Sequence, residues 1–366
     1  MLERFFEKDD GSPAANGDPV AVLAGGDDDP RFAMKSRILA DLNAHPFSPA
    51  WWMPAAHGQT AWSVFYRQMP EVAFRSERWE TPDDDFLCLH ITEGAPEKPT
   101  VLLLHGLEGS VQSNYMMGML AAFSRIGWRA IALEHRTCGE AGMNRAKRTY
   151  HSGETSDLDF VVRRLSESEP GLRLYIVGVS LGGNITAKWL GDGLNDIPEC
   201  VRGASAICPP FDLTISAPAL DDVMWGAYNR RFFRTLIPKA LEKAKQYPGI
   251  LNVEKIEASS GWWDFDTYAT AALHDFDDAE HYWQSVSCGQ FLGEIDRPTL
   301  LIAAEDDPFN PPETLPREIA DASPYLYPQF TRKGGHVGFI HGTPRESRHW
   351  AEEQTLRFFE ALEREA

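Results

Sequence analysis

The sequence has little cysteine, no long apolar run and a shortage of basic residues. Its five cysteines are scattered and form no C-x-x-C pair, at positions Cys88, Cys138, Cys200, Cys208 and Cys288. An odd number of separate cysteines argues against a disulfide framework and against a zinc site. No segment approaches the roughly 18 continuous apolar residues of a membrane-spanning helix, and no basic stretch at the start leads into an apolar one. We therefore predict a soluble protein of the reducing cytoplasm.

The shortage of basic residues makes the chain strongly acidic. Lysine and arginine total 35 against 54 aspartates and glutamates, which gives a formal net charge of −19. Over most of the surface such a charge repels phosphate backbones and anionic bilayers, so nucleic acid is excluded as a partner. The 366 residues are 43% hydrophobic and 11% aromatic, which is enough apolar surface for a substantial core. The chain is therefore predicted to be globular.

The first part of the chain differs in composition from the rest. Residues from about 9 to 30 mix Gly, Ala, Pro and Asp, which bury too little surface to offset the entropy of ordering them. We predict a disordered acidic tail over residues 1–30 and a single domain over residues 31–366. From Arg31 to about Gln68 the sequence predicts a short helix followed by an irregular aromatic segment.

Short apolar runs then recur with helical patterns between most of them. Two extended runs between Glu71 and His90 flank the turn-forming cluster Thr81–Asp85 and predict a hairpin. Six further runs lie at Thr100–Leu104, Arg129–Leu133, Arg173–Val179, Gly203–Cys208, Pro298–Ala304 and Tyr325–Phe330. This rhythm is typical of an α/β protein with a mostly parallel eight-stranded sheet flanked by helices. Residues of about 209–297 are too many for one crossover helix and predict a helical cap insertion over the sheet's carboxyl edge.

A Gly-rich turn joins one of these strands to a helix. Gly178-Val179-Ser180-Leu181-Gly182 matches the G-x-S-x-G elbow, which exposes a nucleophilic serine between a strand and a helix in the α/β-hydrolase fold. The flanking glycines leave room where strand and helix approach each other. The motif alone could be an ordinary turn with an idle serine, but the strand and helix around it favour Ser180 as a nucleophile.

Chain order then selects the partners of the serine. In this fold the acid ends a later strand and the base follows the last one. Asp306 and Asp307 follow the Pro298–Ala304 strand, and we prefer Asp307 because Pro308 fits the turn that presents the acid. His336 follows the last strand between glycines that allow a tight loop. The predicted triad is therefore Ser180, Asp307 and His336.

The loop after the Thr100–Leu104 strand occupies the position of the first active-site loop of this fold. We assign the oxyanion-binding amides to the backbone N–H groups of Leu107 and Leu181. Each such donor is typically worth about 3 kcal/mol of transition-state stabilisation. His105 is expected to brace the loop, because the elbow geometry gives proton transfer to a later histidine.

Other chemistry-bearing residues allow two interpretations. No H-E-x-x-H or similar spacing indicates a catalytic metal, no cofactor is predicted, and four histidines are expected to be structural: His57, His151, His274 and His341. A basic cluster in the cap is either a solvated face or a docking patch for an anionic head group or lipid surface: Arg230, Arg231, Arg234, Lys239, Lys243 and Lys245. Four cap tryptophans either line an acyl pocket or pack in the core: Trp225, Trp262, Trp263 and Trp283.

With these motifs, the sequence resembles the YheT-like branch of the α/β-hydrolases, to which abhydrolase-domain lipases and yeast ethyl ester synthases are related. The resemblance runs from about Phe47 to Phe359 and includes His57-Gly58-Gln59-Thr60, Thr81–Phe86, His105–Gly109, Tyr150–Thr155, Gly178–Asn184, Asp306–Phe309 and Gly334–Phe339. It implies the same triad. Two departures concern glycines of the family: Asp84 replaces one in the turn of the hairpin, and Thr137 replaces one after the fourth strand.

The residues together predict a serine hydrolase that cleaves small, lipid-like carboxylic esters of medium or long acyl chain through an acyl-enzyme on Ser180. Peripheral membrane contact stays an open alternative. An acyltransferase would use the same acyl-enzyme and let an alcohol outcompete water, as the resemblance to ester synthases suggests. A hydrolase-fold binding module without chemistry would fit the fold but is disfavoured by a complete triad.

Overall fold

The computed structural model describes residues 29–365. The tail predicted for residues 1–30 therefore lies outside the described residues, except for Asp29 and Pro30. These two residues form the start of helix α1 (Pro30–Asn43), where the Asp29 carboxylate accepts a hydrogen bond from the Arg31 N–H at 2.9 Å. Within residues 29–365, no helix has both the length and the hydropathy needed to cross a membrane.

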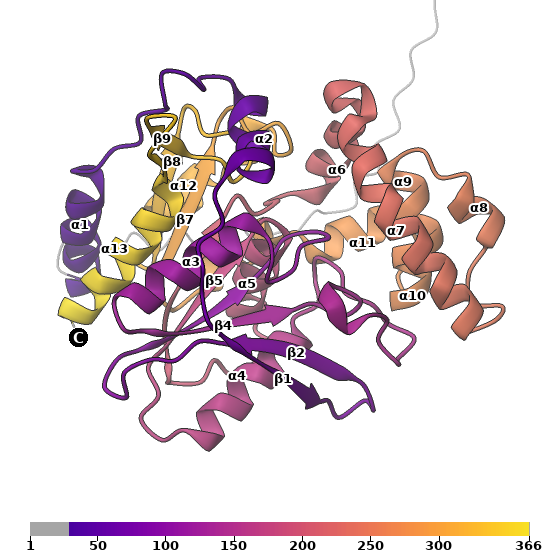
Figure 1. Ribbon diagram of the computed structural model, residues 1–366, viewed down its shortest axis with the longest axis horizontal. Coiled ribbons are helices and arrows are strands. Elements are labelled where there is room, and N and C mark those ends of the chain that lie inside the picture. Colours follow the sequence, from indigo (N-terminus) through magenta and orange to yellow (C-terminus); the bar gives the residue numbers. More distant parts are fainter. Residues whose placement is uncertain (1–28, 366) are drawn as a thin grey trace, which may run out of the picture.

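Eight strands form one sheet in the order β1-β2-β4-β3-β5-β6-β7-β8. The first three in this order pair antiparallel, and all pairs from β4 to β8 run parallel. The predicted α/β-hydrolase sheet, mostly parallel and eight-stranded, is thus confirmed (Figure 1). The strand bounds are Arg75–Glu80 (β1), Phe86–Ile91 (β2), Thr100–Leu104 (β3), Arg129–Glu134 (β4), Leu174–Val179 (β5), Val201–Ile207 (β6), Thr299–Ala304 (β7) and Leu326–Thr331 (β8).

Helices cover both faces of the sheet because the central strands are apolar on both sides. On β3, Val101 and Leu103 pack with helices α3 (Asn114–Arg125) and α13 (Trp350–Glu365). Leu102 and Leu104 point the opposite way and pack with α4 (Ser156–Ser168) and α5 (Leu181–Gly191). Because the strands from β4 to β8 in the sheet order run parallel, their carboxyl ends all lie at one edge of the sheet, where ligands of α/β proteins bind.

The segment between β6 and β7, residues 209–297, is called the cap segment below. Its helices gather beside the sheet in Figure 1 and enclose an aromatic core that includes Phe233, Trp262, Phe265, Tyr282 and Trp283. The elements are α6 (Leu213–Asp222), η2 (Val223–Gly226), α7 (Ala227–Gln246), α8 (Val253–Glu257), α9 (Trp262–Phe265), the π-helix η3 (Asp266–Ala271), α10 (Ala272–His274), α11 (Ala279–Val286) and η4 (Cys288–Glu294). The remaining elements are η1 (Gly139–Ala141), η5 (Pro312–Thr314), α12 (Arg317–Ala322), β9 (Ile340–Gly342) and β10 (Ser347–His349).

One helix differs from the sequence-based expectation. The stretch predicted to be irregular contains helix α2 (Ala56–Tyr66). Its sequence carries a glycine and several residues of modest helix propensity, and no side chain caps its start. Tertiary contacts stabilise it instead, since Gln59 is fully buried and its side chain donates to the backbone oxygens of Met53 and Ile340 at 2.7 and 3.1 Å.

Candidate active site

Ser180 lies in the sharp turn between β5 and α5. Its backbone φ is 54° and ψ is −120°, a conformation that residues other than glycine rarely adopt. Two glycines make the turn possible. A Cβ atom at Gly178 would lie 2.1 Å from the Gly182 carbonyl oxygen, and one at Gly182 would lie 2.6 Å from the Leu104 carbonyl oxygen. The turn places the serine at the carboxyl edge of the sheet, in the strand–turn–helix setting that the G-x-S-x-G pattern predicts.

Hydrogen bonds join three side chains that are far apart in the sequence. His336 Nε2 lies 2.8 Å from Ser180 Oγ, and His336 Nδ1 lies 2.8 Å from Asp307 Oδ2. Because a carboxylate only accepts, the neutral imidazole carries its proton on Nδ1 and accepts from the serine hydroxyl at Nε2. The structure therefore brings the three predicted residues into direct contact, with Asp307 and His336 buried.

The two neighbouring aspartates have different partners. Asp307 holds the histidine with Oδ2, while its Oδ1 accepts the Phe309 N–H at 2.8 Å. Asp306 Oδ1 accepts the Gly335 N–H at 2.9 Å, and burial raises the pKa of the Asp306 carboxyl. One carboxylate orients the imidazole and the other holds the backbone of the loop that carries it. This geometry agrees with the preference for Asp307.

Helix α2 holds the same loop from the other side. The His336 N–H donates to Thr60 Oγ1 at 2.9 Å. Gly335 has a φ of +59°, and a Cβ atom there would lie 2.4 Å from the Ala56 carbonyl oxygen. Only glycine fits this close approach between the loop and α2. The helix that was not predicted is therefore the support of the histidine loop.

The sequence did not predict the supporting roles of three residues. Thr60 binds the loop backbone, Asp306 binds it from the opposite side, and Asn310 donates through Nδ2 to Asp307 Oδ2 at 3.2 Å. The only sequence signal for Thr60 was its place in the His57–Thr60 run of the family resemblance. No periodicity could reveal these contacts, because each joins segments far apart in the chain or within a tight turn.

The loop after β3 leaves one amide without an internal partner. The N–H groups of Gly106 and Glu108 donate to the hydroxyls of Tyr115 and Tyr150, each at 2.9 Å. Within residues 29–365, the Leu107 N–H between them has no hydrogen-bond acceptor. A Cβ atom at Gly106 would lie 3.0 Å from the Ser180 Cβ, so this loop runs directly beside the serine.

The second predicted amide lies at the start of α5. Leu181 is the first residue of that helix, whose early N–H groups have no intrahelical acceptor. Its N–H likewise finds no acceptor among the described residues. Helix N-termini favour negative charge, so the position suits a developing oxyanion. The oxyanion role of Leu107 and Leu181 stays a prediction.

Both hydrogen bonds of the His105 ring are to backbone groups. Its Nε2 accepts the His135 N–H at 3.1 Å, so Nδ1 carries the proton and donates to the Gly106 carbonyl oxygen at 2.7 Å. Burial, together with the neighbouring His135, lowers the pKa of His105 well below its usual value. A neutral, fully buried ring of this kind fits the bracing role expected for it.

The basic cluster of the cap segment divides into parts with different environments. Lys239 Nζ lies 2.7 Å from Glu108 Oε1, which also accepts the Tyr150 hydroxyl at 2.8 Å. Lys243 is fully buried and donates to the backbone oxygens of Asn144 and Ala146 at 2.8 and 2.6 Å, and burial lowers the pKa of Lys243 to about 8. These two lysines connect helix α7 to the body of the protein, whereas the three arginines are exposed.

A cavity of about 620 Å³ opens above the serine. Gly106, Leu107, Ser180, Leu181 and His336 line its floor. The cap segment contributes an apolar wall, formed by Leu213, Ala217, Leu220, Phe232, Leu236, Trp262 and Phe265. A cavity of this size and lining is typical of sites for small apolar ligands.

The cap tryptophans and the remaining histidines also lie in different environments. Of the four tryptophans only Trp262 lines the cavity, while Trp283 is buried in the cap core and donates to Asp266 at 2.8 Å. Trp225 and Trp263 are exposed. His151 lines the cavity, and its ring is tilted against the ring of His274, with the two centroids 4.4 Å apart. Burial lowers the pKa of His151 to about 3.

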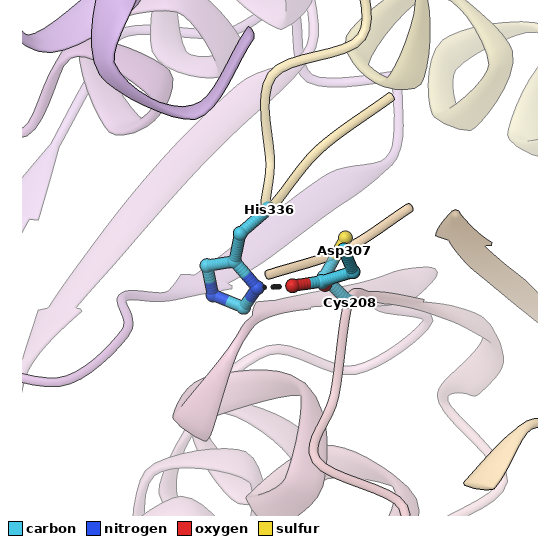
Figure 2. A group of neighbouring side chains, drawn as sticks. All are labelled: Cys208, Asp307 and His336. Atoms are coloured by element: carbon cyan, nitrogen blue, oxygen red, sulfur yellow. Dashed lines mark hydrogen bonds and ion pairs between the residues drawn. The ribbon is translucent and has the colours of Figure 1, made fainter. Parts of the chain in front are cut away.

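Figure 2 shows a third side chain beside the Asp307–His336 pair. The thiol of Cys208 and one ligand atom of each partner lie within 4.8 Å of one another, which is close enough for a shared metal ion. The thiol accepts the Val337 N–H at 3.4 Å, and burial raises the pKa of Cys208 well above its usual value, which disfavours the thiolate that binds metals. His336 Nδ1 is already engaged by Asp307. The arrangement therefore suits a hydrogen-bonded pair better than a metal site.

Comparisons with known proteins find a matching family and similar enzymes. The family described as serine aminopeptidase, S33 matches residues 95–325, a span that contains Ser180 and Asp307. The chain is 35% identical over 302 residues to YheT of Escherichia coli (strain K12), whose name assigns it to the esterases, covering 81% of this chain and 87% of that protein. It is 26% identical over 326 residues to phospholipase ABHD3 of Mus musculus, covering 85% of this chain and 78% of that protein.

Solved structures show the same fold at lower identity. An esterase of Pyrococcus furiosus superposes with a TM-score of 0.51 and 17% identity, covering 80% of this chain and 91% of that one.

Proposed function

Since the chain belongs to the serine aminopeptidase, S33 family and, within the α/β-hydrolases, to the YheT-like branch, we propose that it hydrolyses carboxylic esters at Ser180. The observation that carries the proposal is the chain of hydrogen bonds from Ser180 through His336 to Asp307 at the floor of an apolar cavity. The enzymes that it resembles in sequence bear esterase and phospholipase names, which supports the ester as the scissile group.

The proposed reaction has two halves. Ser180 Oγ attacks the ester carbonyl while His336 Nε2 takes the hydroxyl proton, and the amides of Leu107 and Leu181 stabilise the oxyanion. The tetrahedral intermediate collapses, the C–O bond to the alcohol breaks, and Nε2 returns the proton to the departing oxygen. Water then attacks the acyl-enzyme with its proton going to Nε2, and the acid leaves as Ser180 recovers its hydrogen. Asp307 orients the ring and stabilises the imidazolium throughout.

The acyl group is proposed to be of medium or long chain. The cap segment's apolar wall would bury methylenes, each worth roughly 0.8 kcal/mol, or about fourfold in kcat/KM. A series of nitrophenyl esters from acetate upward tests this on the purified enzyme. We expect kcat/KM to rise with each added methylene until the chain fills the cavity. A flat profile, or a preference for acetate, would contradict a lipid-like substrate.

The nucleophile is tested by Ser180→Ala. The substitution should lower turnover on the order of a millionfold, because the members of a triad act as a unit. A fluorophosphonate probe should label the native chain and not the variant, and thermal unfolding should show that both are folded. Full activity, or unchanged labelling, in Ser180→Ala would refute the assignment.

A further inference from the structure

Exposed apolar side chains of α2 border one side of the cavity's mouth. Val64 and Phe65 line the cavity, yet their side chains are 49% and 67% exposed. Tyr66, next in the chain, is also 67% exposed. Contiguous apolar side chains of this size in water mark a surface that meets something apolar.

The turn before α7 leads directly into residues that line the other side of the cavity. Trp225 is 87% exposed, and it and Met224 have left-handed backbones with φ of 53° and 51°. Arg230 Nη1 donates to the Trp225 carbonyl oxygen at 2.8 Å and holds this turn. Tyr228, one turn further, lines the cavity, and its hydroxyl lies 3.3 Å from His57 Nδ1 on α2. The two apolar borders therefore meet at one opening, on the side of the molecule where α2 and α6 stand in Figure 1.

Three arginines lie beside this opening. Arg230, Arg231 and Arg234 are exposed, share one face of α7 by their spacing, and form no ion pair within residues 29–365. Arg231 itself lines the cavity. In a chain with a net charge of −19, this is a local surplus of positive charge around an apolar rim. The combination matches an interface that is apolar inside and anionic at its surface.

The same features disfavour the other occupants of an apolar surface. A second copy of this chain packed symmetrically, rim against rim, would bring two sets of arginines together, which is repulsive. A protein seated on the rim would close the cavity above Ser180. A bilayer that covers the opening would instead supply lipid molecules to the cavity.

We propose that the rim of Trp225, Met224, Val64, Phe65 and Tyr66 rests on an anionic phospholipid membrane, with the three arginines at the level of the head groups. The aromatic side chains lie at the boundary between head groups and acyl chains, where tryptophan and tyrosine are favoured. That the bound lipid enters the cavity as a substrate rests on the proposed function. Binding itself does not depend on catalysis.

Binding is tested with the full chain carrying Ser180→Ala, so that the vesicles stay intact. The chain is mixed with vesicles of phosphatidylcholine alone and of phosphatidylcholine with 30 mol% phosphatidylglycerol, chosen at about physiological ionic strength, and sedimented. We expect binding to the anionic vesicles that weakens as salt is added. An equal or absent response to the two vesicle types would overturn the proposal.

Two variants locate the surface. Trp225→Ala should weaken binding about tenfold, from the loss of one buried aromatic side chain. Arg230→Gln with Arg234→Gln should weaken it about 25-fold, at about fivefold for each charge removed near the surface. Leu194→Ala and Arg202→Gln are matched controls, since both residues are exposed and lie at the opposite, amino-terminal end of β6. Weakening by the controls, or none by the rim variants, would contradict the assignment.

Activity measurements distinguish the membrane-docking proposal from the proposed esterase function. In the chain with Ser180 intact, Trp225→Ala should leave hydrolysis of a water-soluble nitrophenyl butyrate unchanged and lower hydrolysis of vesicle lipid about tenfold. Vesicle binding by a chain that hydrolyses no ester would keep the docking surface and reject the esterase. Concentration-dependent dimerisation that Trp225→Ala abolishes, without vesicle binding, would assign the rim to a protein interface and overturn the membrane.

Discussion

Buried charged side chains have different kinds of partner at the sheet edge and in the cap segment. Near the sheet, the fully buried Arg136 guanidinium lies 2.6 Å from Asp85, 2.7 Å from Asp157 and 3.0 Å from Asp83. In the cap, the buried Asp266 carboxylate has no cation within the described residues and accepts only from neutral groups. Buried charge in the body is thus paired with opposite charge, whereas in the cap it is met by neutral donors within an aromatic core. The proposed catalytic residues lie at the carboxyl edge of the sheet in the body, and the cap segment carries the proposed acyl-binding wall.

The largest expected difference lies within the sheet edge itself. Asp307→Asn should lower kcat about 10⁴-fold, because an amide no longer fixes the imidazole tautomer or stabilises the imidazolium. Asp306→Asn should lower it about tenfold, because Asp306 holds only the Gly335 amide of the loop. Steady-state kinetics on the same ester measure both. Equal losses would mean that the two carboxylates share one role.

The ion pair between Lys239 and Glu108 joins the cap segment to the loop after β3. Lys239→Met removes the charge that lies 2.7 Å from Glu108 and leaves a mostly buried carboxylate beside the loop of Leu107. We expect kcat to fall about tenfold with KM changed less than twofold. The effect should stay moderate, because losing one partner of a partly exposed ion pair costs less free energy than losing one partner of a fully buried pair. Lys239→Arg should restore most of kcat.

Lys243→Met is the matched control for this contact. Lys243 also joins α7 to the body, through the backbone oxygens of residues 144 and 146, but touches no part of the loop after β3. It should lower the free energy of unfolding and leave kcat within twofold. A similar fall in kcat for both lysine variants would show that the cap acts through its overall position and not through Glu108.

The unpaired carboxylate of the cap gives a pH-dependent prediction. Burial raises the pKa of Asp266 to about 6, against about 3.9 in an unfolded chain. The unfolded state therefore loses its proton first as the pH rises, so the stability that protonation gives is complete below about pH 4 and is lost up to about pH 6. Asp266→Asn should be more stable than the native chain at pH 8 by about 3 kcal/mol and nearly equal at pH 4. Urea unfolding at the two pH values measures this.

Asp85→Asn is the counterpart in the body. Its carboxylate is fully buried against Arg136, so neutralising it should destabilise the protein by about 3 kcal/mol. The two isosteric substitutions should therefore have opposite signs at pH 8. The same sign in both would mean that Asp266 has a cation partner in solution.

The sequence predicted more of the body of the protein than of the cap segment. The strands, the elbow and the order of Ser180, Asp307 and His336 were predicted, because each depends on local apolar runs and turn glycines. Helix α2 was missed because long-range contacts of Gln59 and Thr60 stabilise it against weak local propensity. In the cap the sequence left the arginines, lysines and tryptophans ambiguous, because one amphipathic pattern fits both a buried contact and an exposed face.

The smallest expected effect comes from the departures from the family pattern. Asp84 and Thr137, where the family resemblance implies glycine, both have positive φ, 57° and 67°. Such a backbone costs an L-residue about 1–2 kcal/mol, less for aspartate, while glycine loses about 0.5–1 kcal/mol more entropy on folding. Because the Asp84 side chain is fully exposed, Asp84→Gly should raise the free energy of unfolding by about 0.5 kcal/mol, whereas Asp84→Ala should lower it. Thr137→Gly should gain less, because Thr137 is buried and loses packing, so equal gains at both positions would show that strain alone decides.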